Sequence, residues 1–458
     1  MEIEKLLYLP ESKVLEFKRD ISSLEPILKT VIAFANTAGG TLIIGRSSEG
    51  GLVGVKDVFK AEEALASSIS DNIRPSIFPD IEIATVEGKD LLIVKVSHWR
   101  APFYLKKEGI PQGVYVRLGT TNRPASPELL AELQRTVLML SYDQQPLVDV
   151  SKDALQLEAA VHRFASLKKE STEEKFRSLG ILSAVDRRYV PSVGGLILFG
   201  KKEIRSQWVP DARVSCARFL GNDKASILDR LDVEGTILDA VEEVLKFVAR
   251  NTRMAAEIKN IFRRDIPEYS PVALREALIN ALVHADYSLS GSHIQIAIFN
   301  NRLEIQNPGM FPFGFTLDDF KAGVSRVRNR VIARVFHELK WMEEWGSGYK
   351  RIMEACREGG YPQPKWEELG TYIRVTFYPS PQTTLTFRET AESELMNLEV
   401  EILSLFEAGQ TLAVREIFKK VESRISKRTL QYILAELKRK GYLISKGKGR
   451  ALVWLRIQ

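Results

Sequence analysis

The chain has 458 residues, of which 45% are hydrophobic and 27% charged, and its formal net charge is +6; these values are ordinary for a globular protein with buried cores, and the length suggests about three domains at ~100–200 residues each. No apolar run approaches the roughly 18–20 residues that a membrane-spanning helix needs, and the first ten residues lack the apolar core of a signal peptide. The two cysteines, Cys216 and Cys356, exclude a disulfide framework or a Cys-x-x-Cys metal site, so we expect a cytoplasmic protein with no membrane partner.

Residues 1–140 are predicted to form one α/β domain. An extended segment over Leu15–Lys18 precedes a helix over 24–36, which the sequence Ala38-Gly39-Gly40 ends. A closing helix is predicted over 127–140. Between these helices, short apolar or alternating runs separated by turn residues predict strands over 41–45, 81–83, 90–96 and 114–118.

Three segments of this domain, 11–18, 34–45 and 115–123, resemble the Schlafen AlbA-type domain. In bacterial regulators of that family the domain is regarded as DNA-binding. The resemblance therefore implies that cationic side chains of the domain contact a nucleic-acid backbone, and the candidates are Lys18, Arg117 and Arg123.

In animal Schlafens the same domain is an RNA-cleaving core that holds a metal ion with two Glu and one Asp. Glu11 and Glu16 have the spacing of the two Glu, and carboxylates that close can share a divalent ion. Arg46 stands where the third carboxylate is expected, and a cation there opposes metal binding. The resemblance thus leaves nuclease activity as an alternative to DNA binding.

Residues 141–270 are predicted to connect the first domain to the next one. The patterns indicate a helix over 154–167, a buried strand over 193–199 and a long helix over 235–252. Gly195 to Lys201 matches most of a Walker A phosphate loop. Its interior is apolar, however, and Lys202 stands where that loop needs Ser or Thr, so we exclude this function.

Residues 271–380 are predicted to form a second α/β domain, with a helix over 271–284 and a hairpin over 294–298 and 303–305. Glu276, Asn280 and His284 follow one another at intervals of four residues and therefore form one polar stripe on the helix. A Glu four residues before an Asn offers a general base for water and an oxygen ligand for Mg²⁺.

This stripe resembles the N-box of the GHKL ATP-binding superfamily, in the divergent form of Schlafen-related bacterial regulators. The resemblance implies a GHKL-like α/β sandwich that binds ATP and Mg²⁺, with Glu276 as the base of a weak ATPase and Asn280 as the Mg²⁺ ligand. It also implies further nucleotide-binding positions, which follow the family order. These are His284, Asn307 and Gly309, then Arg328 and Asn329 of the lid, and then Gly346 and Gly348.

One of these positions departs from the family. Asn307 stands where the family has the Asp that reads adenine, and an Asn keeps the carbonyl acceptor but not the charge. Binding of ATP is therefore the expectation, and a retained fold with an inactive pocket is the alternative.

Residues 381–395 are predicted to be a polar linker, and 396–458 to fold as three helices followed by a hairpin, which is the order of a winged helix. Residues 401–458 hold thirteen Lys and Arg against five Glu, whereas the remaining 400 residues sum to −2. We expect the third helix and the hairpin loop to contact DNA through Ser426, Lys427, Arg428, Thr429, Gln431, Lys446, Lys448 and Arg450. A winged helix that binds protein is the alternative.

The sequence thus predicts an α+β multidomain protein, built from an AlbA/Schlafen-like α/β domain, a GHKL-like sandwich and a winged helix. We expect a DNA-binding transcriptional regulator that responds to ATP. Winged helices usually read DNA as pairs, so we also expect a homo-oligomer. A metal-dependent nuclease acting in nucleic-acid defence and a nucleotide-independent assembly scaffold are the two competing hypotheses.

Overall fold

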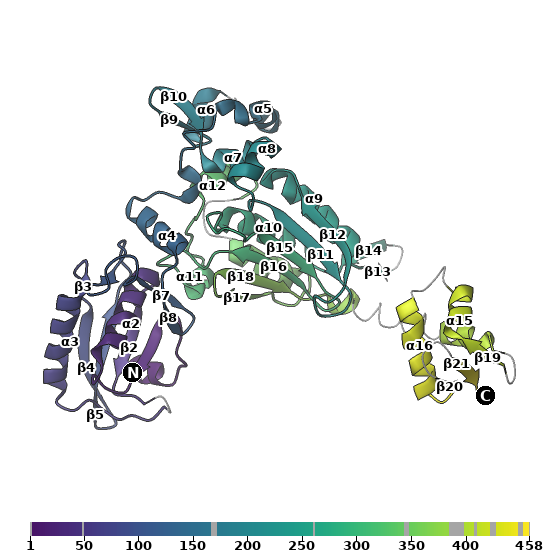
Figure 1. Cartoon of the computed structure of the whole chain (residues 1–458), viewed down its shortest axis with the longest axis horizontal. Helices are drawn as coiled ribbons and strands as arrows, with labels where there is room; N and C mark the ends of the chain where they lie inside the picture. The colour runs from purple at the N-terminus through teal and green to yellow at the C-terminus, as the bar shows by residue number, and fades with distance from the viewer. Residues whose placement is uncertain are drawn as a thin grey trace. The chain divides into compact units, whose positions relative to one another are not determined.

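The computed structural model divides into two compact units (Figure 1). Unit 1 comprises Met1–Thr252 and Tyr269–Pro379, and unit 2 comprises Arg253–Glu268 and Ser380–Gln458. The fold is mixed α and β, with several small sheets. No helix of the described residues is long and apolar enough to cross a bilayer. The residues that the structure describes are 2–47, 50–165, 172–259, 262–342, 348–383, 398–406, 410–421, 427–447 and 452–457.

The N-terminal part of unit 1 is a four-stranded sheet in the order β1-β2-β5-β4, with two helices packed on it. Strand β1 runs parallel to β2, and the other pairs are antiparallel. The helix predicted over 24–36 and the strands around it are confirmed, whereas the second helix, α3, was not predicted. The elements are α1 (Glu2–Leu7), β1 (Leu15–Lys18), α2 (Leu24–Thr37), β2 (Gly40–Ile44), α3 (Val58–Asn72), β4 (Asp80–Val86) and β5 (Lys89–Val96).

Two short strand pairs and a helix complete this part: β3 (Ile73–Arg74) with β6 (Tyr104–Leu105), β7 (Tyr115–Leu118) with β8 (Thr121–Pro124), and α4 (Pro127–Val137). Helix α4 ends before residue 140, because Met139 adopts a left-handed φ of 56° that cannot continue a helix. Side chains of β7 and α4 share one hydrophobic cluster with Met310 and Phe313. This cluster joins the N-terminal domain to the central part of the same unit.

The connecting region contains more helix than its sequence suggested. Residues 193–199 form a helix, α7, and not the predicted strand. The Ser192 hydroxyl accepts a hydrogen bond from the Gly195 N–H and caps this helix, and Gly194 and Gly195 allow close packing against Val331 and Ile181. The elements are η1 (Tyr142–Gln144), η2 (Lys152–Ala154), α5 (Leu157–Ala165), α6 (Glu173–Ser178), β9 (Leu182–Val185), β10 (Arg188–Pro191), α7 (Val193–Phe199), α8 (Lys202–Trp208) and α9 (Ile237–Asn251).

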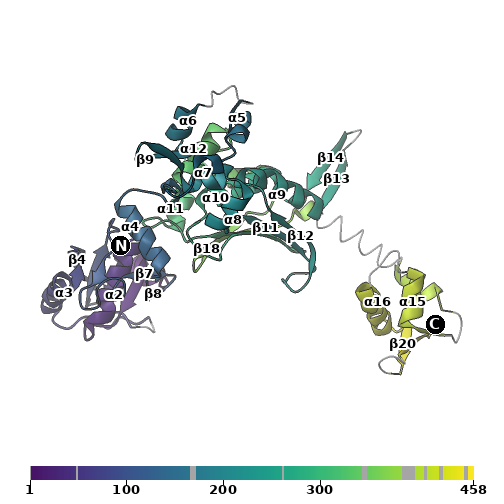
Figure 2. The same ribbon diagram turned by 45° about the horizontal axis from the view of Figure 1, so that its top comes forward.

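A six-stranded mixed sheet in the order β12-β11-β15-β16-β18-β17 forms the centre of unit 1. Its first two strands precede residue 271, so the sheet takes in part of the connecting region. Figure 2 shows α9 and α10 on one face of this sheet. The strands are β11 (Val214–Phe219), β12 (Ile227–Val233), β15 (Ile294–Ile298), β16 (Leu303–Pro308), β17 (Lys365–Leu369) and β18 (Tyr372–Phe377); the helices are α10 (Pro271–His284), α11 (Leu317–Ala322), α12 (Arg330–Glu338) and α13 (Gly348–Glu358).

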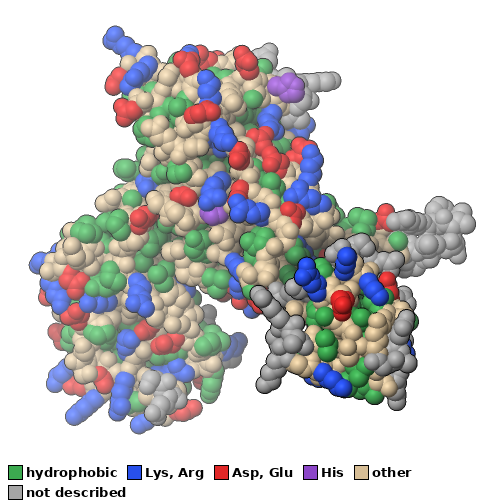
Figure 3. All heavy atoms as spheres, turned by 45° about the vertical axis from the view of Figure 1, so that its right-hand side comes forward, with side chains coloured by type: hydrophobic (Ala, Val, Ile, Leu, Met, Phe, Trp, Pro, Cys, Tyr) green, Lys and Arg blue, Asp and Glu red, His purple; other side chains and the backbone are tan. Residues whose placement is uncertain are grey.

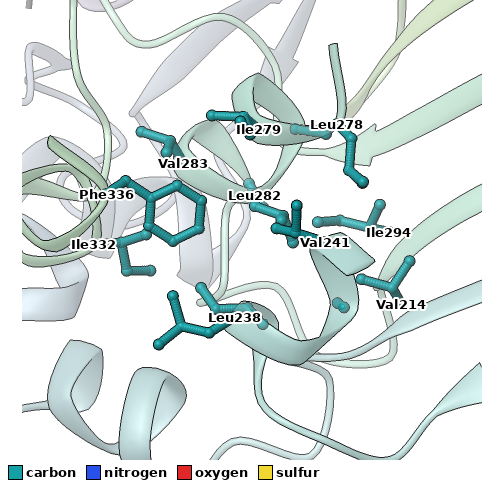
Figure 4. Close-up of a cluster of buried hydrophobic side chains, with 14 of the residues drawn as sticks. Val214, Leu238, Val241, Leu278, Ile279, Leu282, Val283, Ile294, Ile332 and Phe336 are labelled. Carbon is teal, nitrogen blue, oxygen red and sulfur yellow. The ribbon is translucent and has the colours of Figure 1, made fainter. Parts of the chain in front are cut away.

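Helix α10 lies in the middle of the largest hydrophobic core. Its Ser270 hydroxyl accepts a hydrogen bond from Ala273 N–H, and Pro271 follows in the first turn, which are favoured residues for a helix start. Figure 4 shows Leu282 of α10 among side chains of α9, α12 and the sheet. Because apolar residues surround most of the helix, its polar stripe is held rigidly against the sheet.

Unit 2 contains a hairpin, β13 (Met254–Lys259) with β14 (Phe262–Pro267), and a C-terminal module. In the module, residues 398–404 are helical, and Leu430, Ile433, Leu434 and Leu437 are buried. Gly441 takes a φ of 80° after the last helix. The other elements are β19 (Thr411–Ala413), α15 (Val414–Val421), α16 (Lys427–Arg439), β20 (Leu443–Lys446) and β21 (Val453–Arg456), with a sheet order of β19-β21-β20.

Candidate functional site

The predicted polar stripe of α10 borders a pocket of about 130 Å³. Five of the residues predicted to bind nucleotide line it together: Glu276, Asn280, His284, Asn307 and Gly348. They come from α10, from β16 and from the first residue of α13. The fold therefore gathers into one cavity residues that lie up to 72 positions apart in sequence.

Gly348 brings the start of α13 against the carboxylate and the amide of the stripe. A Cβ atom at Gly348 would lie 2.8 Å from Asn280 Nδ2 and 3.1 Å from Glu276 Oε1. Nε of Arg351, one turn along α13, lies 3.9 Å from Glu276 Oε2. Only a residue without a side chain leaves this contact open, as a backbone that approaches a phosphate requires. Gly346, another predicted glycine, lies outside the described residues.

Asn307 supplies a buried polar atom that has no partner in the described part of the chain. Its side chain is 7% exposed, and its Oδ1 accepts no hydrogen bond. A buried acceptor without a donor costs free energy on the order of 1–3 kcal/mol, so such an atom beside a cavity is suited to a ligand N–H. An adenine amino group is a donor of this kind. At this position the residues present fit the nucleotide that the resemblance implies.

A cluster of aromatic side chains lines another part of the pocket. The ring centroids of Phe320, Tyr349 and Trp366 lie 5.1–5.6 Å from one another, and Phe311 lies 5.8 Å from Phe320. Small-molecule sites usually enclose roughly 300–1,000 Å³. The pocket is smaller than that, so a nucleotide fits only if some of these rings move.

His284 is uncharged at neutral pH. Burial, and to a smaller degree the charge of Arg328, lowers the pKa of His284 to about 4. A neutral imidazole can donate or accept a hydrogen bond, but it adds no positive charge for phosphates. Its place in the stripe is therefore that of a polar wall residue.

Arg328, Asn329 and Gly309 were predicted to contact the nucleotide, but the structure gives them other partners. Arg328 Nη1 forms ion pairs with Glu132 Oε1 at 2.5 Å and Asp286 Oδ2 at 3.2 Å. Asn329 Nδ2 donates to the carbonyl oxygens of Val283 and Ala285 at 2.8 and 2.7 Å, where it closes the end of α10. These long-range bonds would have to break before either side chain could contact a nucleotide, and that contact of Arg328 and Asn329 stays a prediction.

Gly309 has a structural reason to be glycine. Its φ is 102°, and a Cβ atom there would lie 2.8 Å from Asp286 Cβ. Its N–H donates to the Thr371 carbonyl oxygen at 2.7 Å. The residue forms the turn after β16 and does not line the small pocket.

The carboxylates predicted for a nuclease are already engaged. Glu16 is buried and forms ion pairs with Lys18 Nζ at 2.5 Å and with the fully buried Arg117. Glu11 Oε1 accepts a hydrogen bond from Phe17 N–H at 3.1 Å. The guanidinium carbon of Arg46 lies 3.8 Å from the centre of the Phe17 ring. No group of three or more His, Cys, Asp or Glu suited to a metal ion occurs in the described residues.

These contacts also bear on the predicted nucleic-acid contacts of the N-terminal domain. Arg117 is 0% exposed and donates to the Ser12 carbonyl oxygen and to Asn122, so its contact with a nucleic-acid backbone stays a prediction that this burial does not favour. Lys18 is half-buried beside Glu16, whereas Arg123 is exposed. Figure 3 shows basic and acidic side chains intermixed over the visible face of unit 1.

In the C-terminal module, Gln431 and Lys446, which are predicted to contact DNA, are exposed. Lys427, Arg428 and Thr429 begin α16, but their side chains lie outside the described part. Ser426, Lys448 and Arg450 also lie outside the described residues.

Two segments match known protein families. Residues 11–126 match the family described as Schlafen, AlbA_2. Residues 291–377 match HATPase_c_4, described as putative ATP-dependent DNA helicase recG C-terminal. These matches support the resemblance to Schlafen AlbA-type proteins with a GHKL-like domain. They indicate a nucleic-acid-related function and are consistent with ATP binding.

Two solved structures are similar to the chain. The DIP2311 protein from Corynebacterium diphtheriae is 19% identical, over 99% of this chain and 96% of that chain, with a TM-score of 0.45. The N-terminal domain of a putative ATP-dependent DNA helicase RecG-related protein from Nitrosomonas europaea is 30% identical, over 27% of this chain and 90% of that chain, with a TM-score of 0.21. No curated protein matches the chain.

Proposed function

We propose that this protein is a DNA-binding transcriptional regulator that responds to ATP and Mg²⁺. In this proposal a winged helix in unit 2 reads DNA, and the Glu276–Asn280 pocket of unit 1 binds the nucleotide. The observation that carries the nucleotide part is the Asn307 Oδ1 atom, which is buried at the pocket without a hydrogen-bond donor.

The DNA-binding part rests on the two faces of α16. Leu430, Leu434 and Leu437 are buried, which leaves Gln431 on the exposed face of the same helix. A side-chain amide there can pair with a base edge, and the basic residues at the start of the helix can contact phosphates. The surplus of eight positive charges in residues 401–458 suits a polyanion.

The nucleotide part assigns one task to each residue of the pocket. Asn307 accepts a hydrogen bond from the adenine amino group, and Asn280 offers its amide oxygen to Mg²⁺. Glu276 holds and can deprotonate a water molecule, and the Gly348 backbone leaves room beside both side chains. Bound ATP would supply a phosphoanhydride bond for slow hydrolysis.

The response to ATP would arise because the pocket is too small for a nucleotide. Binding requires Phe320 and Tyr349 to move, and these rings belong to α11 and α13. Movement of these helices would bias the arrangement of subunits in a homo-oligomer and so the spacing of two winged helices on DNA.

A nucleotide-independent assembly scaffold is the second candidate, and the filled pocket is the observation that favours it. In that case the aromatic cluster replaces the nucleotide as the core of this region. The scaffold predicts no calorimetric signal with ATP·Mg²⁺ and the same oligomer with or without it.

The DNA-binding part is tested with two matched double variants. Lys427→Ala with Arg428→Ala removes two charges at the start of α16, and Arg415→Ala with Lys419→Ala removes two exposed charges from α15. We expect the first pair to weaken duplex binding about tenfold and the second pair to weaken it less, because base-reading helices enter the groove by their N-terminal ends. If both pairs lowered the DNA affinity equally, α16 would not be the base-reading helix, and the binding would be non-specific charge attraction.

A further inference from the structure

A second cavity, of about 570 Å³, lies beside the small pocket in unit 1. Helix α4 and the residues after it form one side, and the segment 312–330 forms the other. We call it the arginine cavity, because five arginines line it: Arg100, Arg135, Arg326, Arg328 and Arg330.

The three carboxylates that line the arginine cavity already have partners. Glu132 and Asp286 both pair with Arg328. Asp319 Oδ2 accepts hydrogen bonds from the backbone N–H and the hydroxyl of Thr316, where it caps α11. The four other arginines form no ion pair within the part of the chain that the structure describes. The cavity therefore holds an excess of positive charge.

Neutral acceptors fix the directions of three of these four side chains. Arg326 Nη1 donates to the Gly314 carbonyl oxygen at 2.9 Å, and Arg330 Nη1 donates to the Met139 carbonyl oxygen at 2.8 Å. Arg135 Nη2 lies 3.3 Å from Ser288 Oγ. A guanidinium has five N–H donors, so each of these bonds orients the group and leaves most of its donors for an anion.

The arginines of the cavity repel one another when no anion is bound. Burial, and next the nearby charge of Arg100, lower the pKa of Arg326 below its usual range. Like charges that are partly removed from water repel one another, and a bound anion would relieve that repulsion.

Apolar and aromatic side chains form part of the wall of the arginine cavity. Tyr142 lies under the Arg135 guanidinium at 5.4 Å, and Phe313 and Phe315 also line the cavity. The exposed side chains of Met139 and Leu140 lie among the lining residues. Flat apolar surfaces beside fixed guanidinium groups suit a ligand that carries both a planar ring and several phosphates. The volume lies within the range of roughly 300–1,000 Å³ that small-molecule sites occupy.

We propose that the arginine cavity binds a small polyphosphorylated ligand of the nucleoside di- or triphosphate class, at a site separate from the Glu276–Asn280 pocket. This goes beyond the proposed function, which places its nucleotide in the small pocket. Pro312, Phe315 and Arg326 belong to the wall between the two cavities and line both. A ligand in the arginine cavity therefore contacts the same wall that must move for ATP to enter the small pocket, which makes it an effector site.

The test uses the full chain with the small pocket disabled by Glu276→Ala. Calorimetry with inorganic triphosphate and with ADP measures binding at the arginine cavity. We expect both to bind and to compete with each other. In the same background, Arg100→Ala with Arg330→Ala, two exposed residues, should weaken both ligands about tenfold or more, since each charged hydrogen bond contributes measurably.

A matched control removes two exposed cations elsewhere on unit 1, by Lys60→Ala with Lys246→Ala, and should leave the affinity unchanged. Thermal melting verifies that each variant is folded. The proposal is overturned if the folded Glu276→Ala chain binds neither triphosphate nor ADP, or if the arginine pair and the lysine pair have equal effects. Binding of a single-stranded oligonucleotide that nucleotides fail to displace would overturn it as well, because the cavity would then serve a nucleic acid.

Discussion

The guanidinium of Arg117 forms an ion pair with Glu16, and both side chains are buried, at 0% and 6% exposure. Lys18 holds the other carboxylate oxygen of Glu16. A carboxylate held by two cations is a poor ligand for a metal ion, because its charge is already compensated. The residues that resemble a nuclease site and a DNA contact thus stabilise one another in the core of the N-terminal domain.

Substitution of Arg117 by Ala should therefore lower the free energy of unfolding by about 3–5 kcal/mol, the usual cost of removing one partner of a buried ion pair. Urea unfolding of the full chain measures the effect. Arg123→Ala, which removes an exposed cation of the neighbouring strand, should change stability by about 0.5 kcal/mol or less. Similar small effects of both variants would mean that the buried pair does not stabilise the domain.

In a chain whose arginine cavity is disabled by Arg100→Ala with Arg330→Ala, Gly348→Ala should weaken ATP binding about tenfold or more, because its Cβ would lie 2.8 Å from Asn280 Nδ2. Alanine favours a helix more than glycine does by about 1 kcal/mol, so the substitution should not destabilise α13 through helix propensity. Calorimetry gives the affinity. Gly51→Ala, whose Cβ would have no neighbour nearer than 3.5 Å, is the control and should bind ATP as the wild type does. Undiminished binding in Gly348→Ala would place the nucleotide elsewhere.

In the same background, with Arg100→Ala and Arg330→Ala, Asn307→Ala removes the acceptor assigned to adenine. A net hydrogen bond is usually worth about 0.5–1.5 kcal/mol, so ATP affinity should fall between about twofold and tenfold. Affinity for inorganic triphosphate, which has no base, should stay the same. Parallel titrations of the two ligands separate these effects. Equal losses for both would show that Asn307 acts on the shape of the pocket and does not read the base.

Two half-buried histidines, His284 and His98, should make the protein less stable in acid. The pKa values of His284 and His98 are both lowered to about 4, and burial is the main cause for each. The unfolded chain takes up these protons near the ordinary pKa of about 6.5, so stability is lost as the pH falls from about 7 toward 4. Between pH 7 and pH 5 each histidine should contribute about 2 kcal/mol of this loss.

Urea unfolding of His284→Gln at pH 7 and pH 5 measures that share, since the variant should show a smaller pH dependence than the wild type. His162 is exposed, and His162→Gln serves as the control with an unchanged dependence. If His284→Gln and the wild type lose equal stability between the two pH values, His284 is not the neutral, buried group described above.

The spacing of residues in the sequence predicted those parts of the site that lie on a single helix. The stripe of Glu276, Asn280 and His284 follows from helical periodicity. Residues 193–199 were predicted wrongly as a strand, because an apolar run of seven residues fits either structure. The Ser192 cap is a local signal that the strand prediction did not use, whereas the space that Val331 leaves for Gly194 depends on a distant segment.

Contacts between segments that are distant in the chain could not be predicted from local sequence patterns. Arg328 was predicted to contact nucleotide because it follows a family motif, whereas its partner Glu132 lies 196 residues away. The arginine cavity was missed for the same reason. Arg100, Arg135 and Arg330 come from three separate segments, and nothing near any one of them signals that the others are close.

The central claim, a nucleotide-responsive DNA-binding protein, is tested most directly by fluorescence anisotropy with duplex DNA, with and without ATP·Mg²⁺, for the wild type and Glu276→Ala. We predict that ATP·Mg²⁺ changes the DNA affinity of the wild type by about fivefold or more, the lower end of usual coupling between sites, and leaves that of Glu276→Ala unchanged. DNA affinity that is indifferent to ATP in both proteins would contradict the coupling and favour the scaffold. Absence of DNA binding in both would contradict the whole account.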